Sequence, residues 1–299
     1  MIRLALLIPL SLSICTALIR AQDAKLTPEI QSIQKRIQQS GADVAVAFRT
    51  LDGKSQWYFH EDEVFHAAST MKIPVMIELF HQVRENKLTL DDTLPIQNEF
   101  RSLVDGSVFT LDPKDDSEFD LYKAIGQTRT LRQLCELMIT VSSNFATNLL
   151  IDKLGVENIR AIVHALNADG MSVLRGVEDN KAYEKGMNNT TTARGLQVLL
   201  EAIAAGRAVD EESSRQMREI LERQTFKEDI PAGLPPGTRV AHKTGDLAKI
   251  HHDAGIIYAP RPFVLVVLVR GMADFKESGR IIADITRQIY QLAESDILP

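Results

Sequence analysis

Hydrophobic positions near the start of the chain change from helical to alternating spacing. Ile30, Ile33 and Ile37 follow Pro28 at the intervals of an amphipathic helix. Two short stretches, 43–51 and 55–60, then alternate or run apolar on either side of Asp52-Gly53. Apolar stretches around such a dipeptide are typical of a hairpin. This part of the chain therefore predicts one helix followed by two antiparallel strands.

The far end of the chain has a matching pattern. Stretches 239–244, 254–258 and 263–270 are apolar enough to predict strands, and 274–295 has helical spacing. The inner side of that last helix is formed by Ile281, Ile282, Ile285, Ile289 and Leu292. Between the two ends, residues from about 69 to 225 predict mainly helices joined by polar loops.

Strands at both ends with helices between them predict an α+β fold. We expect an α/β sandwich, in which one antiparallel sheet is built from both ends of the chain and flanked by the terminal helices. An all-helical lobe is inserted between the two parts of the chain that build the sheet. The sheet lobe is expected at about 25–65 and 226–299, and the helical lobe at about 66–225. Functional groups are expected in the cleft between the lobes, because pockets favour such junctions.

The first residues predict a secretory signal peptide over 1–21. Arg3 precedes an apolar stretch at 4–19 that Pro9 interrupts, and Ala21 lies at the expected cleavage point. The stretch is short and interrupted for a membrane span, which favours a cleaved signal; the alternative is an uncleaved anchor. We therefore expect a secreted or periplasmic protein, with 22–299 as one mature domain and no stable membrane insertion after cleavage.

Composition and cysteine content argue against a nucleic-acid partner and against an internal disulfide. Hydrophobic residues make up 44% of the chain, and the net charge is −6 with no long basic run. This balance is ordinary for a globular protein and argues against a nucleic-acid partner. Cleavage would remove Cys15 and leave Cys135, so a mature monomer has no internal disulfide. Cys135 lies in an apolar helical stretch, which predicts a buried core thiol.

Ser69-Thr70-Met71-Lys72 is the first candidate for chemistry. On a helix, residues three apart share a face, so the lysine amine is expected near the serine hydroxyl. Lysine can activate serine if burial or a neighbouring positive charge lowers its pKa. A serine at a helix start also lies where developing negative charge is favoured. Ser32 and Lys35 have the same spacing on the solvated side of the first helix, so this motif needs support.

Two later motifs provide that support. Ser142-Ser143-Asn144 follows an apolar helical stretch, and Lys243-Thr244-Gly245 follows the strand-like 239–242. Each motif alone is also compatible with a structural role, as a helix cap or a strand end. In this order, however, the three match the active-site set of the penicillin-recognising serine enzymes.

On these motifs the chain resembles the class A β-lactamases and related serine hydrolases, over about 25–299. The stretches 130–135, 148–150 and 190–193 also resemble the family at the corresponding places. The resemblance implies a serine hydrolase that opens the β-lactam amide through an acyl-enzyme, without a cofactor or a metal ion.

The resemblance also implies which residues carry the chemistry. Ser69 would be the acylated nucleophile, and Lys72 would take part in activating it. Ser142 would relay a proton to the departing ring nitrogen. The backbone N–H groups of Ser69 and Asp246 would form the oxyanion hole, where two fixed donors meet the new alkoxide.

Substrate binding is implied at the second and third motifs. Asn144 would bind the side-chain amide of the substrate. Lys243 and Thr244, in the motif that Gly245 completes, would hold the substrate carboxylate.

Deacylation is the step at which the chain departs from the family. A class A enzyme uses a loop glutamate two residues after an arginine, whereas here Glu178 follows Arg175 by three. Three interpretations stay open: Glu178 activates water through an altered loop, Asp179 does so with a shorter side chain, or turnover is slow. Glu178 is also compatible with a solvated carboxylate paired with Arg175 or Lys181.

Other departures concern the surroundings of the site. Met76 stands where many relatives have a cysteine partner for the helix cysteine, and Asn189 replaces the loop-closing aspartate. Between Lys87 and Thr130 the chain is longer than usual, and 112–120 is highly acidic. The candidates here for an apolar wall beside the substrate are Phe100, Val104 and Phe109.

Histidines around the third motif suggest zinc, because imidazole and carboxylate are zinc ligands. Residues 251–253 read His-His-Asp, but adjacent strand residues point to opposite faces and cannot converge on one ion. We therefore expect no metal site, and interpret His242 as a neighbour that tunes Lys243.

Two rival functions use the same acylation residues. One is a D,D-peptidase, for which the substrate would be a peptidoglycan peptide. The other is a β-lactam binder that acylates without turnover, as a sensor does. In each case we expect a small-molecule or peptide substrate and a monomeric protein.

Overall fold

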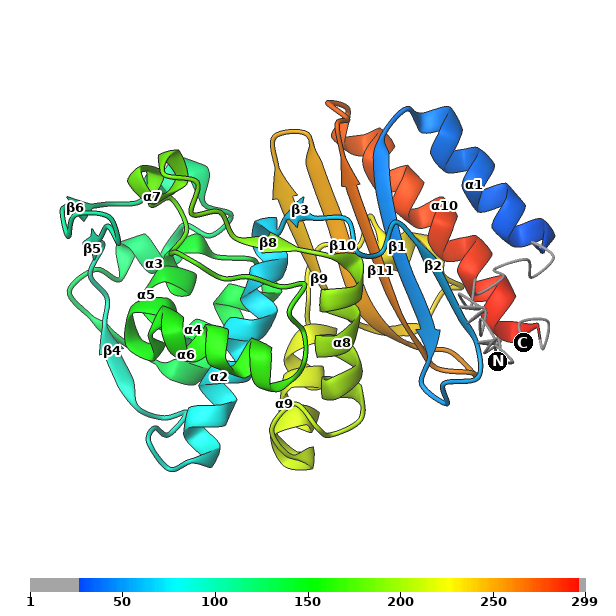
Figure 1. The fold of residues 1–299 in the computed structure, drawn as a ribbon. Coiled ribbons are helices and arrows are strands. Elements are labelled where there is room, and N and C mark those ends of the chain that lie inside the picture. Colours follow the sequence, from blue (N-terminus) through cyan, green and yellow to red (C-terminus); the bar gives the residue numbers. More distant parts are fainter. Residues whose placement is uncertain (1–26, 296–299) are drawn as a thin grey trace, which may run out of the picture.

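A five-stranded antiparallel sheet forms the centre of the molecule (Figure 1). The computed structural model describes residues 27–295, so the predicted signal peptide at 1–21 lies outside the described residues. The order of the strands is β2-β1-β11-β10-β9. Their bounds are β1 Asp43–Thr50, β2 Gln56–Phe59, β9 Arg239–Leu247, β10 Ile250–Tyr258 and β11 Phe263–Arg270. The predicted sheet from both ends of the chain is confirmed.

Two helices lie side by side against one face of this sheet (Figure 1). They are α1, Pro28–Ser40, and α10, Phe275–Glu294. The hydroxyl of Thr27 caps α1 by accepting from the N–H of Ile30, and the left-handed Gly41 ends the helix. The predicted inner residues of both helices are buried against the sheet, as their spacing indicated.

The opposite face of the sheet meets the helical lobe (Figure 1). Helix α8, Ala193–Ala204, packs directly on strands β1, β10 and β11. The other longer helices are α2 Lys72–Arg84, α4 Leu131–Thr140, α5 Asn144–Leu154, α6 Val156–Ala165 and α9 Glu211–Glu222. Helix α2 is buried along most of its length, because α4, α5, α6 and α9 all contact it. It therefore forms the axis of the lobe.

The extra residues between Lys87 and Thr130 form small strands and turns, which the prediction of a mainly helical middle missed. Strand β4, Thr93–Pro95, pairs with β7, Thr128–Thr130, and β5, Phe100–Arg101, pairs with β6, Val108–Phe109. A 3-10 turn η2, Pro113–Asp115, and helix α3, Asp120–Lys123, complete the segment. These pieces surround the starts of α5 and α7, Asn180–Glu184.

Strands β9 and β10 are longer than the sequence predicted. Strand β9 extends to Leu247, and strand β10 already begins at Ile250. The polar residues 251–253 therefore lie within β10. The prediction missed this because buried strands are normally apolar, whereas here His251, His252 and Asp253 are buried and hydrogen-bonded.

The core contains Cys135 and Met76, both fully buried. Burial raises the pKa of the Cys135 thiol to about 12, which confirms the prediction of an inert core thiol. Among the helices in 27–295, none has the length and apolar composition needed to cross a bilayer.

Candidate active site

Ser69 lies in a 3-10 turn, η1, that spans Ala68–Met71, and α2 begins only at Lys72. The prediction that the serine starts the helix is therefore corrected by one turn. The hydroxyl of Thr70 fixes the turn by donating to the carbonyl of Ala67 at 2.6 Å. Ser69 itself is half-buried, and its hydroxyl has no hydrogen-bond partner in the described part of the chain. The Ser69 hydroxyl is thus free to meet a substrate.

Lys72 is fully buried and points at the second motif. Its Nζ donates to the carbonyl of Ser142 at 2.6 Å, to the hydroxyl of Ser142 at 3.1 Å and to Oδ1 of Asn144 at 2.9 Å. We expected the amine beside the Ser69 hydroxyl, but its hydrogen bonds go to Ser142 and Asn144 instead. Burial and the nearby Lys243 ammonium hold the pKa of Lys72 well below its ordinary value, as activation of a serine requires.

Ser142 lies between two lysines. Its hydroxyl accepts from Lys72 and also from Nζ of Lys243, at 3.0 Å. A hydroxyl has two acceptor sites and one hydrogen, so two N–H donors leave that hydrogen free to be given away. The backbone of Ser142 has φ 61° between α4 and α5. This uncommon conformation for a non-glycine residue is a local strain that a functional position can carry.

Lys243 is also fully buried, and its Nζ donates to the carbonyl of Thr244 at 2.9 Å. Burial lowers the pKa of its ammonium to about 8. The third motif thus adds a second lysine nitrogen to the same hydroxyl, and both lysines were identified from the sequence.

The third motif brings strand β9 into contact with the Ser69 turn. Strand β9 is the edge strand of the sheet, so half of its backbone groups have no neighbouring strand. A methyl group on Gly245 would lie 3.2 Å from the backbone nitrogen of Ser69 and 3.1 Å from that of Thr70. This close approach leaves little room for a side chain at position 245, and it places strand β9 directly against the Ser69 turn.

Asp246 extends from the exposed end of this strand. Its carboxylate is 40% exposed and lies 3.5 Å from Nε2 of His251. Partial burial, with Asp229 nearby, raises the pKa of Asp246 to about 6. Because adjacent strand residues alternate, its side chain lies on the opposite side of the strand from that of Lys243.

Glu178 reaches the site from the loop after Val177. Its Oε1 lies 3.4 Å from Nδ2 of Asn144, the residue that binds Lys72. Burial, together with repulsion from Asp115 and Asp116, raises its pKa. The alternative of a carboxylate paired with a loop cation is wrong. Arg175 donates to the carbonyls of Met187 and Gly176, and Lys181 pairs with Asp105.

Asp179 has a different position. It is buried, and its carboxylate accepts from the hydroxyl of Ser102 at 2.8 Å, from the N–H of Leu103 at 2.9 Å and from the N–H of Ala182 at 3.1 Å. These partners hold the loop against the insertion and cap α7. Both of its oxygens are engaged away from Lys72.

The backbone of this loop is clamped by two asparagines. Asn148 of α5 both accepts from the N–H of Val177 at 2.7 Å and donates to its carbonyl at 2.8 Å. Asn189 accepts from the N–H of Leu174 and donates to the carbonyl of Arg175. Asn189 therefore closes the loop through backbone hydrogen bonds in place of an ion pair. Val177 stands two residues after Arg175, where the class A pattern has its glutamate.

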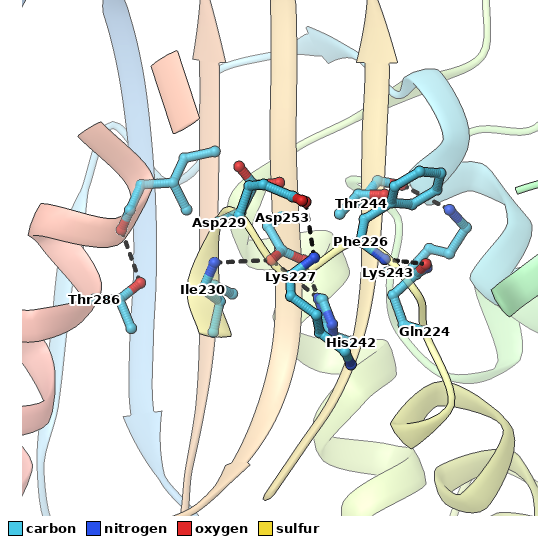
Figure 2. A network of polar contacts seen from close by, with 12 residues as sticks. Gln224, Phe226, Lys227, Asp229, Ile230, His242, Lys243, Thr244, Asp253 and Thr286 are labelled. Carbon is cyan, nitrogen blue, oxygen red and sulfur yellow. Dashed lines mark hydrogen bonds and ion pairs between the residues drawn. The ribbon is translucent and has the colours of Figure 1, made fainter. Parts of the chain in front are cut away.

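A buried polar network lies behind β9 (Figure 2). Nδ1 of His242 contacts both carboxylate oxygens of Asp253 at 3.0 Å, and the N–H of Ile230 donates to Asp253 at 3.0 Å. His242 points away from Lys243, because adjacent strand residues alternate. The interpretation of His242 as a direct tuner of Lys243 is therefore wrong.

The alternation predicted for 251–253 is confirmed. His251 contacts Asp229 and Ser278, while His252 points the other way, to the carbonyl of His66. Within 27–295, no three histidine, cysteine or acidic side chains are grouped as ligands for a metal ion.

Sequence reasoning missed two contributors, Asn148 as a clamp and Asp116 as a partner of the second motif. Asn148 lay in a stretch that resembles the family, but nothing in its spacing indicated a contact with Val177. Asp116 lies in the insertion and accepts from the backbone N–H groups of Asn144 and Phe145. No local pattern predicts such a long-range contact.

Comparison with known proteins agrees with this geometry. The family model described as the β-lactamase enzyme family matches residues 26–293. The extended-spectrum β-lactamase PER-1 of Pseudomonas aeruginosa is 25% identical, over 91% of this chain and 88% of its own. Among solved structures, a β-lactamase of Sphaerobacter thermophilus has a TM-score of 0.75 at 25% identity, covering 91% of this chain and 98% of its own.

A second solved relative, PBP-A, has a TM-score of 0.77 at 27% identity, covering 90% of this chain and 97% of its own. A variant of PBP-A has been solved as an acyl-enzyme complex with penicillin G. The family match spans nearly all of the described chain, and the three motifs converge on one site. The chain therefore belongs to the β-lactamase enzyme family, as a serine enzyme of the class A type.

Proposed function

We propose that this protein hydrolyses β-lactams through a covalent acyl-enzyme on Ser69. The observation that carries the proposal is the Ser142 hydroxyl, held between the side-chain nitrogens of Lys72 and Lys243. Family membership supports the same activity.

The first half of the reaction uses the three motifs. The substrate carboxylate is held by Lys243 and Thr244, and its carbonyl oxygen by the N–H groups of Ser69 and Asp246. The Ser69 oxygen attacks the carbonyl carbon while its proton passes to unprotonated Lys72. Burial favours that neutral form of Lys72.

Ring opening completes acylation. The C–N bond breaks, and the Ser142 hydroxyl gives its proton to the leaving nitrogen and regains one from the adjacent lysine. Asn144 binds the side-chain amide of the substrate while its Oδ1 remains on Lys72.

The second half needs a base for water, and we assign it to Glu178. Its carboxylate lies beside Asn144, whereas that of Asp179 is fully engaged. Glu178 takes a proton from water, the hydroxide attacks the ester carbon, and the proton passes to the Ser69 oxygen as the ester breaks. Gly245 completes the strand motif by allowing the close contact of β9 with the turn.

One observation favours a second candidate, a penicillin-binding protein that stays acylated or acts on peptidoglycan peptides. Asn148 binds the backbone of Val177, and Val177 stands at the position where the class A pattern has a glutamate. PBP-A, a similar structure, forms an acyl-enzyme with penicillin G as a variant. In this alternative, Glu178 would activate water poorly.

Turnover of a chromogenic cephalosporin, followed together with intact-mass spectrometry, separates the two. Sustained hydrolysis with only transient mass gain supports the β-lactamase, and one equivalent of product with a stable adduct supports the second candidate. Ser69→Ala is expected to abolish the adduct. The matched control is Ser32→Ala, because Ser32 has the same spacing to a lysine but is exposed on α1. An adduct that survives Ser69→Ala would contradict the nucleophile.

We also propose that the protein acts after export, as a monomer in the periplasm or outside the cell. The pattern of residues 1–21 supports export. The N-terminal sequence of the exported protein tests whether residues 1–21 are removed. Its sedimentation coefficient, compared with the value for a mature monomer, tests the oligomeric state.

A further inference from the structure

A carboxylate from the insertion contacts the second catalytic motif. Asp116 follows the η2 turn and is 6% exposed. Its Oδ1 accepts from the N–H of Asn144 at 2.9 Å, and its Oδ2 from the N–H of Phe145 at 2.8 Å. These are the first two residues of α5. A carboxylate at this place satisfies helix N–H groups that otherwise have no partner, and it is favoured by the helix dipole.

The same carboxylate is held firmly from its own side. The hydroxyl of Tyr122 donates to Oδ2 at 3.0 Å, and the N–H of Glu118 donates to Oδ1 at 3.3 Å. The ring of Tyr122 in turn packs on Phe145. The hydroxyl of Ser117 donates to the carbonyl of Val141, directly before Ser142. The insertion is thus bonded to the chain on both sides of Ser142.

These contacts connect Asp116 to Lys72 in a single step. Asn144 binds Asp116 through its backbone and Lys72 through its side chain. The Ser142 carbonyl and hydroxyl also bind Lys72. A shift of the first turn of α5, and of Ser142 just before it, would therefore move the three hydrogen bonds of the Lys72 side chain.

We propose that Asp116 is a positioning residue of the active site. The insertion supplies this carboxylate to fix the first turn of α5, and with it the placement of Ser142 and Asn144 around Lys72. The assignment rests on the proposed acylation of Ser69. It gives a catalytic purpose to the long acidic segment between Lys87 and Thr130, which the sequence left without a role.

The middle residue of the second motif offers an internal test. The motif in penicillin-recognising enzymes reads Ser-Asp-Asn, whereas this chain has Ser143. The Ser143 hydroxyl already accepts from the N–H of Ala146 at 3.2 Å and lies 3.4 Å from Oδ2 of Asp116. A carboxylate at 143 would reach the same helix start, but would repel Asp116 when both are present.

The experiment measures the rate constant of Ser69 acylation by penicillin, from intact mass against time, in five forms of the full chain: the wild type, three variants and one control. Asp116→Asn is expected to slow acylation about 10-fold to 100-fold. Ser143→Asp alone is expected to slow it as well. The double variant is expected to recover most of the wild-type rate, because one carboxylate again serves the helix start. The matched control is Asp120→Asn, since Asp120 belongs to the same acidic segment but is solvent-exposed.

The pH profile of acylation distinguishes positioning from general support of the fold. The charged groups around Lys72 are Lys243, which disfavours its protonated form, and Asp116, Asp246 and Glu178, which favour it. Removing the Asp116 charge should therefore shift the acid limb of the profile to lower pH. A purely structural loss would reduce the rate at every pH without moving that limb.

Each outcome decides the proposal. An Asp116→Asn variant that acylates as fast as Asp120→Asn overturns it, as does a folded double variant that stays slow. If Asp116→Asn alone does not fold, the double variant decides on the same criterion. A wild-type chain that takes no label overturns the proposed function, and with it the reaction that Asp116 would serve. A labelled wild type with unaffected variants overturns the role of Asp116 alone.

Discussion

Glu178 and Asp179 are adjacent carboxylates, yet their surroundings give them different capacities. Glu178 lies next to the Lys72 partner Asn144, and burial raises its pKa. Asp179 is buried among three donors that hold the loop. A base must be able to approach its proton and must have a pKa suited to the transfer. At the scale of single residues, the contact with Asn144 and the raised pKa support the proposed role of Glu178 as the base, whereas the partners of Asp179 hold it in the loop.

We expect Glu178→Gln to acylate at the normal rate and to trap the adduct, lowering kcat about 100-fold to 10,000-fold. Because the pKa of Glu178 is raised, the wild-type deacylation rate should fall as pH drops through a value above 4.5, the ordinary pKa of glutamate. The carboxylate is the active form, so the loss is on the acid side. Single-turnover mass spectrometry across pH measures both effects.

The control for that experiment is Asp179→Asn. It should lower the free energy of unfolding by about 1–3 kcal/mol, because it disturbs a buried hydrogen-bonded carboxylate, and should leave the folded fraction able to deacylate. Normal turnover by Glu178→Gln, with a trapped adduct in Asp179→Asn, would reverse the assignment.

At the scale of elements, the site depends on a strand that touches a helical turn. Strand β9 places Gly245 against the backbone of Ser69 and Thr70. The turn runs directly into α2 at Lys72, and the contact with β9 and the Thr70–Ala67 hydrogen bond help to fix its position. The two N–H groups that we propose as oxyanion donors, those of Ser69 and Asp246, therefore come from two elements that are far apart in the chain and meet at one edge of the sheet.

Gly245→Ala tests this contact. The added methyl group must displace the turn by a few tenths of an ångström, and we expect acylation to slow about 100-fold, with a smaller change in the fold's stability. Leu247→Ala, on the exposed end of the same strand, should acylate normally. Comparing labelling rates with thermal unfolding for the two variants checks the expectation. Equal rates would mean that the turn does not depend on the strand.

Periodicity was sufficient for the elements whose buried residues are apolar. The inner sides of α1 and α10 and the whole of β11 have spacing that depends only on the local chain. It failed where buried residues are polar, as at His251 to Asp253 in β10, because their hydrogen-bond partners lie on distant elements. The motif residues were identified by type and order. The roles of Asp116 and Asn148 could not be identified in this way, because their contacts form only when the chain folds.

At the scale of the whole molecule, the active site is supported by a sheet that two distant parts of the chain build. Strand β1 pairs with β11 along its full length, from Asp43 with Arg270 to Thr50 with Phe263. Helices α1 and α10 then pack against each other, and Arg36 of α1 pairs with Glu277 and Asp284 of α10. The position of β9, and so of Lys243, depends on this joint layer.

We therefore expect Ile33→Ala to destabilise the whole molecule, although Ile33 is far from Ser69 in the chain. Ile33 is fully buried in the terminal-helix layer, so the cavity should reduce the free energy of unfolding by about 2–5 kcal/mol. Acylation by the folded fraction should be unchanged. Denaturant unfolding together with labelling below the transition measures both. Gln38→Ala, exposed on the same helix, serves as the control, and an equal loss of stability there would contradict the argument.

The order of the strands also determines when the protein can assemble. As a ribosome releases the chain, β1 has only β2 beside it, because β11 is among the last elements to be made. Residues 44–48, which are fully apolar and buried in the finished sheet, must wait with one edge unpaired while the helical lobe is synthesised. Such long-range pairing forms slowly, and until it forms the unpaired edge of β1 is prone to aggregation. If the chain crosses a membrane before it folds, the period in which β1 lacks its partner strand occurs after translocation. A holdase that covers β1 during that period would then determine the yield of active enzyme.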